Sequence, residues 1–371
     1  MADVIVAAEA GFPHKHLVSQ NVDGNKVENP HPAVSIFNFH YATPEAAARN
    51  YGLNKPLGDD ETGFKGTTDA PYRREAWRFL LAGGALFSHL DYSFTVGHED
   101  GSFAVPAGQW GGGGPLNRDQ LRHLRDFMHE FDFVRMAPDD GAVAAGLPVA
   151  IAAATLAERG TAYAVYLSPT GEYSVRWTAR LTPPRSETCT FHAISEGGVR
   201  LWVDGEQVID HWAAHTETED SGTVELVAGR TVNVTMEYGK GVGGVGSAKL
   251  HWSASGRTRE VVPAERLTVP DGGGPGVKAE YFAGRDLDRL MLTRTDAVVD
   301  FYWGVSIPFE SDERPLDLRI DLPAGVYRAE WVNPVAGGVE KEERFEHGGG
   351  LRAVTSPGYV EDIALRLKRT P

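Results

Sequence analysis

The chain has 371 residues, a length that accommodates about two or three domains. Its 51 acidic residues outnumber the 36 basic ones, and the resulting net charge of -15 disfavours a nucleic acid as partner. A single cysteine, Cys189, excludes an intrachain disulfide, and its place in a strand-like stretch favours a buried apolar role. No stretch is apolar and long enough to span a membrane, and the N-terminus lacks the basic start and apolar core of a signal peptide.

Strand-like and helix-like segments alternate in the first third of the chain. Such alternation predicts a parallel sheet, with only about half of the eight strand-helix units that a closed (β/α) barrel needs. Asn117 is placed to cap the last helix of this region, whose apolar residues recur on one face. The predicted strands are residues 16–21, 34–41, 55–61 and 86–94, and the predicted helices are residues 3–10, 44–51, 71–81 and 117–131.

From residue 136 onward the pattern changes to short strands separated by Pro and Gly, which is typical of an antiparallel β-sandwich. Between the first and the second of these strands lies a further β-rich block, roughly residues 171–305. Its Asp204-Gly205 pair predicts a tight hairpin turn, and its glycine-rich residues 271–276 predict a flexible linker. The predicted sandwich strands are residues 162–167, 316–322, 327–332, 342–346 and 363–367.

Three consecutive acids, Asp59, Asp60 and Glu61, stand at the end of a predicted strand, just before a Thr-Gly turn. Crowded carboxylates repel one another unless their charge is used, and this edge of a parallel α/β sheet is where barrel enzymes place their chemistry. A solvated acidic turn or a helix cap is the alternative interpretation.

Residues 15–139 resemble the C-terminal half of a retaining glycoside hydrolase barrel of the large clan-A type. The resemblance rests on the segments KHLVSQN, VSIFNFHYA, KPLGDDETGF and YRREAWRFLLAGGALFSHLDYSFTVGHEDG, and it extends to LPAGVYRAEWVNP, FEHGGG and SPGYVEDIALRL near the C-terminus. It implies that Glu61 is the nucleophile, with Asp59 or Asp60 as less favoured candidates. The remaining residues that it implies at the sugar site are His40, Tyr41, Asp60, Asp91, Tyr92, His98, Glu99 and Trp110.

A retaining enzyme also needs an acid/base carboxyl about 5 Å from the nucleophile. In this clan that residue is a Glu that follows an Asn, and no Asn-Glu pair precedes Glu61. We therefore expect a chain that lacks the acid/base half of the barrel and shows weak or absent hydrolysis by itself.

The middle block resembles the protective-antigen-type sugar-binding module. Residues 173–181 (YSVRWTARL) and 190–209 (TFHAISEGGVRLWVDGEQVI) carry this resemblance. The module usually begins with an AEYF strand and an RTD…VDFxW strand. In this chain both strands come after the body, at residues 279–282 and 294–303. A permuted module joined at residues 271–276 explains this order, and a second, truncated copy is the rival explanation.

Lectin-like members of this module hold calcium with two adjacent Asp on a loop. The matching position here is Ser195-Glu196-Gly197-Gly198, in which the paired acids are absent. Calcium prefers about six to eight oxygen ligands, so Glu196 alone is a poor start and no metal site is expected. The tryptophans of the block are expected in the sandwich core; they are Trp177, Trp202, Trp212 and Trp252.

Together these patterns predict an α/β plus all-β chain. A partial (β/α) barrel at residues 1–136 precedes a β-sandwich, residues 137–170 and 305–371, which the module at residues 171–304 interrupts. The expected function is that of a glycoside hydrolase-related protein that acts on or binds a poly- or oligosaccharide; the alternative is a non-catalytic carbohydrate-binding or adhesive protein. No cofactor, nucleic acid or membrane is expected as partner. The missing N-terminal half of the barrel is an expected partner. The family resemblance implies an extracellular or periplasmic location.

Overall fold

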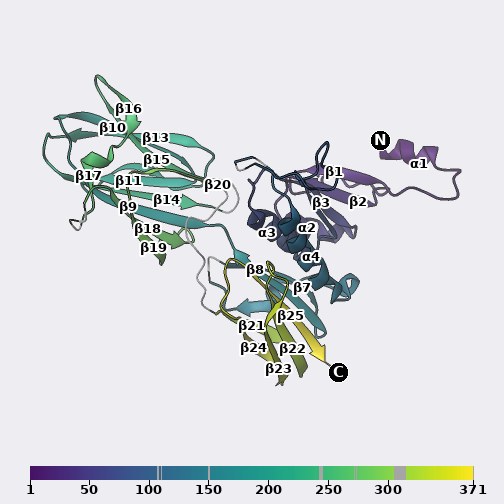
Figure 1. Cartoon of the computed structure of the whole chain (residues 1–371). Helices are drawn as coiled ribbons and strands as arrows, with labels where there is room; N and C mark the ends of the chain where they lie inside the picture. Colours follow the sequence, from purple (N-terminus) through teal and green to yellow (C-terminus); the bar gives the residue numbers. More distant parts are fainter. Residues whose placement is uncertain are drawn as a thin grey trace. The chain divides into compact units, whose positions relative to one another are not determined.

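The chain divides into two compact units (Figure 1). The first unit comprises Met1–Leu147, Ala152–Ser168 and Glu313–Pro371, and the second comprises Pro148–Ile151 and Pro169–Asp312. The computed structural model describes residues 1–106, 108–109, 111–148, 151–241, 245–270, 272, 274–304 and 315–370. Most of the elements in these residues are strands, and none of the helices is long and apolar enough to cross a membrane.

A parallel sheet forms the N-terminal region of the first unit. Among the described residues its strand order is β1-β2-β3-β4, and each neighbouring pair is parallel, as strand-helix alternation predicts. These strands form an open sheet rather than a closed barrel. They are β1 (Ser19–Asp23), β2 (Ile36–His40), β3 (Leu57–Thr62) and β4 (Leu86–His89). The helices of this region are α1 (Ala2–Ala8), α2 (Ala46–Asn50), α3 (Asp69–Leu81) and α4 (Pro115–His129), with 3₁₀ turns at Tyr51–Leu53, Phe133–Arg135 and Asp140–Ala142.

Helices α3 and α4 connect the parallel sheet to the C-terminal strands of the same unit. Trp77 on α3 is fully buried, and its ring lies 4.9 Å from that of Phe127 on α4 and 5.1 Å from that of Tyr166 on β8. The predicted cap of α4 is wrong, because the helix begins at Pro115 and Asn117 is buried within its first turn. Proline suits the first turn of a helix, since the amide hydrogen that it lacks would have no partner inside the helix there.

The C-terminal region of the first unit contains two antiparallel arrays. Within the described residues the larger array has the order β23-β22-β25-β8-β7-β5 and the smaller has the order β24-β21-β6. A module inserted with its two ends close together predicts that the flanking strands, residues 162–167 and 316–322, are neighbours in one sheet. Their counterparts β8 and β21 lie in different arrays, so this prediction is wrong. The Ala-rich strand β7, which lacks a clear β pattern in the sequence, lies beside β8 instead. The bounds are β5 (Ala137–Pro138), β6 (Val143–Ala145), β7 (Ile151–Glu158), β8 (Ala162–Pro169), β21 (Asp317–Leu322), β22 (Gly325–Val332), β23 (Val339–His347), β24 (Gly350–Thr355) and β25 (Ile363–Thr370).

The second unit consists of two facing sheets. Among its described residues, the first sheet runs β13-β10-β15-β16, with β20 also paired to β15. The other sheet runs β12-β11-β14-β9-β18-β19, with β17 also paired to β9. The bounds are β9 (Tyr173–Leu181), β10 (Glu187–Glu196), β11 (Gly198–Val203), β12 (Glu206–His211), β13 (Thr218–Leu226), β14 (Val232–Lys240), β15 (Gly246–Ala254), β16 (Arg257–Val261), β17 (Leu267–Thr268), β18 (Val277–Ala283), β19 (Arg289–Asp296) and β20 (Asp300–Gly304), with a 3₁₀ turn at Ala264–Arg266.

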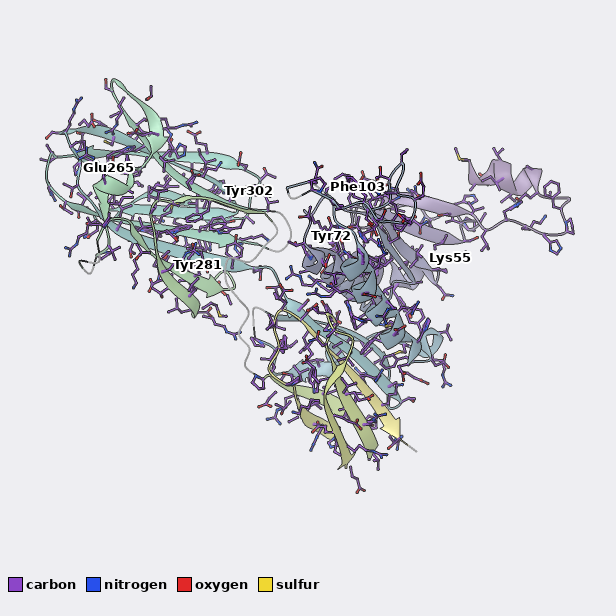
Figure 2. All side chains as sticks on the ribbon, in the orientation of Figure 1. Lys55, Tyr72, Phe103, Glu265, Tyr281 and Tyr302 are labelled. Atoms are coloured by element: carbon purple, nitrogen blue, oxygen red, sulfur yellow. The ribbon has the colours of Figure 1, made fainter. Side chains whose placement is uncertain are left out.

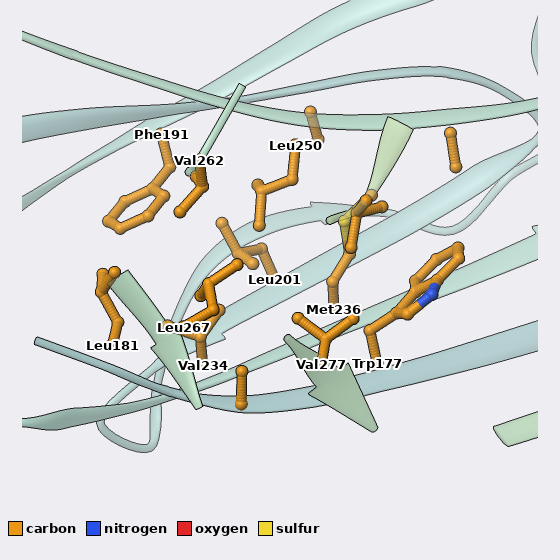
Figure 3. Close-up of a cluster of buried hydrophobic side chains, with 14 of the residues drawn as sticks. Trp177, Leu181, Phe191, Leu201, Val234, Met236, Leu250, Val262, Leu267 and Val277 are labelled. Atoms are coloured by element: carbon orange, nitrogen blue, oxygen red, sulfur yellow. The ribbon is translucent and has the colours of Figure 1, made fainter. Parts of the chain in front are cut away.

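Alternate residues of these strands build one apolar core between the sheets (Figure 3). Trp177 on β9 and Trp252 on β15 are buried there, as expected, and so is Cys189. Trp202 and Trp212 are only half-buried, so their assignment to the core is wrong. Between β11 and β12 the backbone φ angles of 51° at Asp204 and 86° at Gly205 are those of the predicted tight hairpin turn.

The segments that follow the glycine-rich linker take part in both sheets. Strand β18, which carries Tyr281 (Figure 2), pairs with β9 on one side and β19 on the other, while β20 pairs with β15. The permuted order predicts that residues 278–282 pair with the body that precedes them, near residues 250–252 or 261–267. Pairing with the preceding body is confirmed, but the partner is β9, so the two named segments are wrong. Val305, the predicted outer end of this block, lies outside the described residues. The ring of Trp303, close to that end, lies 5.5 Å from the ring of Tyr173 at the start of β9.

Candidate functional site

Polar side chains meet where β2 and β3 end. His40 is in register with Glu61, because the carboxyl ends of neighbouring parallel strands lie at the same edge of the sheet. Its Nδ1 atom lies 3.2 Å from Glu61 Oε2, and its Nε2 atom lies 3.3 Å from Asp60 Oδ1. The hydroxyl of Tyr41 donates a hydrogen bond to Glu61 Oε1, and the Tyr41 amide donates to the Glu61 carbonyl oxygen at 3.1 Å. The Tyr41 phenol thus hydrogen-bonds one carboxylate, and the His40 imidazole lies between two, while Asp60 Oδ1 has no hydrogen-bond partner among the described residues.

Aromatic rings flank these carboxylates. The ring of Phe64 lies 6.1 Å from that of Tyr41 and 6.0 Å from that of Tyr92. Tyr41 is 55% exposed and Phe64 is 44% exposed. Both have positive φ angles, 56° for Tyr41 and 60° for Phe64. Residues other than glycine adopt such angles at a cost in free energy, and they are concentrated at functional sites. Phe64 is not among the residues predicted from the sequence, although it closes the KPLGDDETGF motif.

The hydrogen bond to Glu61 also affects the acidity of Tyr41. That bond is the main reason why the pKa of Tyr41 is raised, and partial burial and the negative charge of Glu61 add to it. The phenol therefore stays protonated over the physiological range and remains a donor to the Glu61 carboxylate.

Asp59 lies on the same strand but is fully buried. Neither of its carboxylate oxygens has a hydrogen-bond partner among the residues that the structure describes. Burial, and then the charge of Glu75, raise the pKa of Asp59 to about 8, although Lys65 acts in the opposite direction. A buried and largely protonated Asp59 cannot serve as the nucleophile, so the carboxylates available at this edge are those of Asp60 and Glu61.

The other predicted sugar-site residues have local roles in the loop after β4. Asp91 accepts hydrogen bonds from the Ser93 amide at 3.0 Å, the Ser93 hydroxyl at 2.6 Å and Arg118 at 3.1 Å. Burial raises the pKa of Asp91, but these hydrogen bonds outweigh that effect and hold the pKa below its ordinary value. His98 Nδ1 lies 2.9 Å from the Ser102 hydroxyl, and Glu99 accepts from the Gly97 amide at 3.0 Å.

The ring of Tyr92 lies next to that of Phe64, which in turn lies next to Tyr41. The polar contacts described above for Asp91, His98 and Glu99 are with residues of their own loop and with Arg118. Trp110 lies outside the described residues.

In the second unit, the position that holds calcium in lectin-like modules is used differently. The Glu196 carboxylate accepts a hydrogen bond from the Val245 amide at 3.0 Å, and the Glu196 amide donates to the Ser247 hydroxyl at 3.1 Å. Glu196 therefore fixes the end of β10.

Comparison with known proteins identifies one family and several more distant likenesses. Residues 154–266 match the model of the PA14 domain. The chain is 35% identical over 187 residues to anti-sigma-I factor RsgI3 of Acetivibrio thermocellus, a match that covers 48% of this chain and 27% of that protein. The chain thus spans about a quarter of the length of this relative.

Solved structures give weaker likenesses. An anti-sigma factor domain-containing protein is 29% identical, with 55% of this chain and 74% of that chain covered and a TM-score of 0.26. A glycoside hydrolase is 13% identical, with 64% and 60% covered and a TM-score of 0.34. TM-scores of this size do not establish a shared fold. From the match to the family model, the chain contains a PA14 domain, most of which lies in the second unit.

Proposed function

We propose that this chain binds a poly- or oligosaccharide at the carboxyl end of its parallel sheet, as a protein related to retaining glycoside hydrolases. The observation that carries the proposal is a pair of neighbouring exposed rings, Tyr41 and Phe64, of which Tyr41 donates a hydrogen bond to the Glu61 carboxylate. Aromatic rings offer a flat apolar face to the C–H groups of a sugar, and carboxylates accept hydrogen bonds from its hydroxyls. The PA14 domain supports the same class of ligand, and on the same ground we propose an extracellular or periplasmic location.

The same residues fit the remains of a retaining site. Glu61 takes the place of the nucleophile, and His40 and Tyr41 fix its orientation through their contacts with its two oxygens. Asp60 contacts the opposite nitrogen of His40, so the two half-buried carboxylates share one imidazole and do not flank a glycosidic bond from opposite sides. Without a general acid, hydrolysis forfeits a factor of about 10² to 10⁴. The chain therefore binds sugar with weak or absent turnover, and a separate barrel half is the partner that would complete the site.

Binding is tested by calorimetric titration of the full chain with a panel of soluble polysaccharides. Replacing Tyr41 by Ala removes one ring and the donor to Glu61, and we expect binding to weaken about tenfold or more, equivalent to about 1.4 kcal/mol. Tyr302→Ala is the matched control, because Tyr302 is an even more exposed aromatic residue, at 70%, on β20 of the second unit. Equal affinities for the two variants would contradict the assignment of the site.

Catalysis is tested with a broad set of aryl glycosides. We expect little or no release of the aryl group by the purified chain, and normal folding of the Glu61→Gln variant. Robust turnover that is lost in Glu61→Gln would show that a second functional carboxyl exists, with Glu99 as the first residue to replace. Co-expression with an upstream barrel half separates an incomplete enzyme from a purely carbohydrate-binding protein.

We also propose that the second unit is a permuted module rather than a module plus a truncated copy. The family match ends at residue 266, yet β18 and β20 beyond it occupy places in both sheets of the sandwich. A truncated copy has no reason to complete its neighbour's sheets. Deletion of β18–β20, residues 277–304, should therefore unfold the second unit, and a second unit that stays folded without them would refute the permutation.

A further inference from the structure

Three metal-ligating side chains of the second unit converge where β12 leads into β13. They are His211 at the end of β12, His215 in the connection, and Asp220 on β13. One ligand atom from each lies within 4.8 Å of the other two. His211 Nδ1 lies 3.0 Å and 3.1 Å from the two carboxylate oxygens of Asp220. Ligand atoms at about 2.0–2.2 Å from a tetrahedral zinc ion are roughly 3.3 Å apart, so the spacing of His211 Nδ1 and Asp220 fits such an ion, whereas the His215 ring has to move away from the His211 ring to become the third ligand.

The tautomer of His215 supplies a second, independent indication. Its Nδ1 atom lies 2.9 Å from the carbonyl oxygen of Thr216, and only a protonated Nδ1 can donate to that oxygen. In the neutral ring this leaves the lone pair on Nε2, which is buried and has no hydrogen-bond partner in the portion of the chain that the structure describes. Metal-binding histidines show the same arrangement, in which a backbone carbonyl holds one nitrogen and the other faces the ion.

The backbone around the cluster is anchored on both sides. The His215 carbonyl oxygen accepts a hydrogen bond from the Gly197 amide at 3.0 Å, and His211 is paired with Val199 in the sheet. The rings of His211 and His215 are stacked with centroids 4.0 Å apart. The backbone of both histidines is thus fixed beside Asp220 by the sheet and the turn.

We propose that His211, His215 and Asp220 form a site for a divalent transition metal of the zinc type. The ion takes the place of the proton between His211 Nδ1 and Asp220, and water or a ligand hydroxyl completes the coordination. Two imidazoles and one carboxylate suit zinc, whereas calcium prefers six to eight oxygen ligands. The site lies against the turn between β10 and β11, where lectin-like modules hold calcium, but it uses different residues and a different class of metal.

The test is calorimetric titration of the chelator-treated full chain with zinc chloride in the absence of sugar, so that its outcome is independent of the saccharide proposal. We expect one zinc ion per chain, no uptake of calcium, and affinities about tenfold or more lower for His215→Gln and for Asp220→Asn. His192→Gln is the matched control, because both ring nitrogens of His192 already contact side chains, those of Glu219 and Ser253. That variant should bind zinc like the original chain.

Cobalt substitution provides a readout that does not depend on the folding of any variant. A cobalt ion in this site should give the intense visible absorption of four-coordinate Co²⁺ with nitrogen and oxygen ligands, and zinc should displace it. The proposal is overturned if the original chain takes up no zinc, if His215→Gln binds zinc as tightly as the original chain, or if bound cobalt shows only the weak spectrum of a six-coordinate ion.

Discussion

Replacement of Asp59 by Asn tests whether the buried carboxyl on β3 makes the parallel sheet sensitive to pH. Asp59 is fully buried, and neither oxygen has a hydrogen-bond partner within the described residues. Its negative charge would face that of Glu75, with Lys65 as partial compensation. Asn has nearly the same shape but no charge at any pH, so the variant isolates the effect of ionisation.

The magnitude follows from the two pKa values. The pKa of Asp59 is about 8 in the folded chain and about 4 in an unfolded one. Between these values the folded state binds one more proton than the unfolded state, so the stability contribution of Asp59 is fully present below about pH 4 and is lost as pH rises toward 8. The free energy of unfolding should fall by about 1.4 kcal/mol per pH unit from this group alone. Between pH 5 and pH 7 the Asn variant should therefore gain about 3 kcal/mol relative to the original chain.

Hydrogen exchange of the β2 and β3 amides is the appropriate assay, because it reports opening of this sheet without requiring the whole chain to unfold in one step. Asp60→Asn is the comparison in which an acid is removed from β3 while Asp59 stays. Because the charge of Asp60 is a minor contribution to the raised pKa of Asp59, we expect the same pH slope only slightly reduced. Only the slope with pH matters, so a constant offset caused by the substitution does not interfere. A stability difference between Asp59→Asn and the original chain that stays the same from pH 5 to pH 7 would refute the reasoning.

Three further predictions concern packing and turns. Arg73→Met should destabilise the first unit by about 3–5 kcal/mol in urea unfolding, because buried Arg73 contacts Asp362 at 2.9 Å and 3.1 Å and its loss leaves that buried carboxylate without its cation. Trp177→Ala should cost the second unit about 3–5 kcal/mol through loss of core contacts, measured by thermal unfolding. Gly205→Ala should cost about 1 kcal/mol in the same assay, because Gly205 has a φ angle of 86°.

Each of these predictions has a matched comparison. The double variant Arg73→Met with Asp362→Asn should recover some of the lost stability, and no recovery would show that the loss is one of packing rather than charge. Trp202→Ala, at a half-buried position, should cost clearly less than Trp177→Ala. Gly229→Ala offers a second glycine with positive φ, at 71°, and a cost at neither glycine would contradict the argument from backbone strain.

Periodicity predicted much of this architecture. Strand-helix alternation is sufficient for a parallel sheet, and strict alternation along β9 and β10 is sufficient for a sandwich core. The pairing of strands that are distant in the chain could not be predicted as well, because the sequence of a strand indicates which face is buried but not which strand lies beside it. For that reason the placement of β8 beside β21 was wrong. Strand β7 was missed because IAAATLAE lacks the β-branched and aromatic residues that identify a strand.

The candidate site shows a similar division. The meeting of His40 with Asp60 and Glu61 follows from the geometry of parallel strands, which brings their carboxyl ends to one edge. Regular alternation would place Asp59 and Glu61, which are two residues apart, on the same face of the sheet. Their different environments follow instead from the irregular register between Asp59 and Glu61 and from tertiary packing, neither of which is visible in the sequence. The position of Phe64 depends on a left-handed backbone conformation that the neighbouring sequence does not predict.

The insertion of the second unit into the first also bears on the order in which the chain folds. Strand β8 must pair with β25, and the pair Leu167 and Ile363 closes a very long loop. Closure becomes more costly with loop length, by about 0.6 kcal/mol for each doubling. The contact between the rings of Tyr173 and Trp303 brings the two ends of the second unit together. When the second unit folds first, the loop that the pairing of β8 with β25 must close becomes effectively shorter. The folding rate of the first unit then depends on the stability of the second unit.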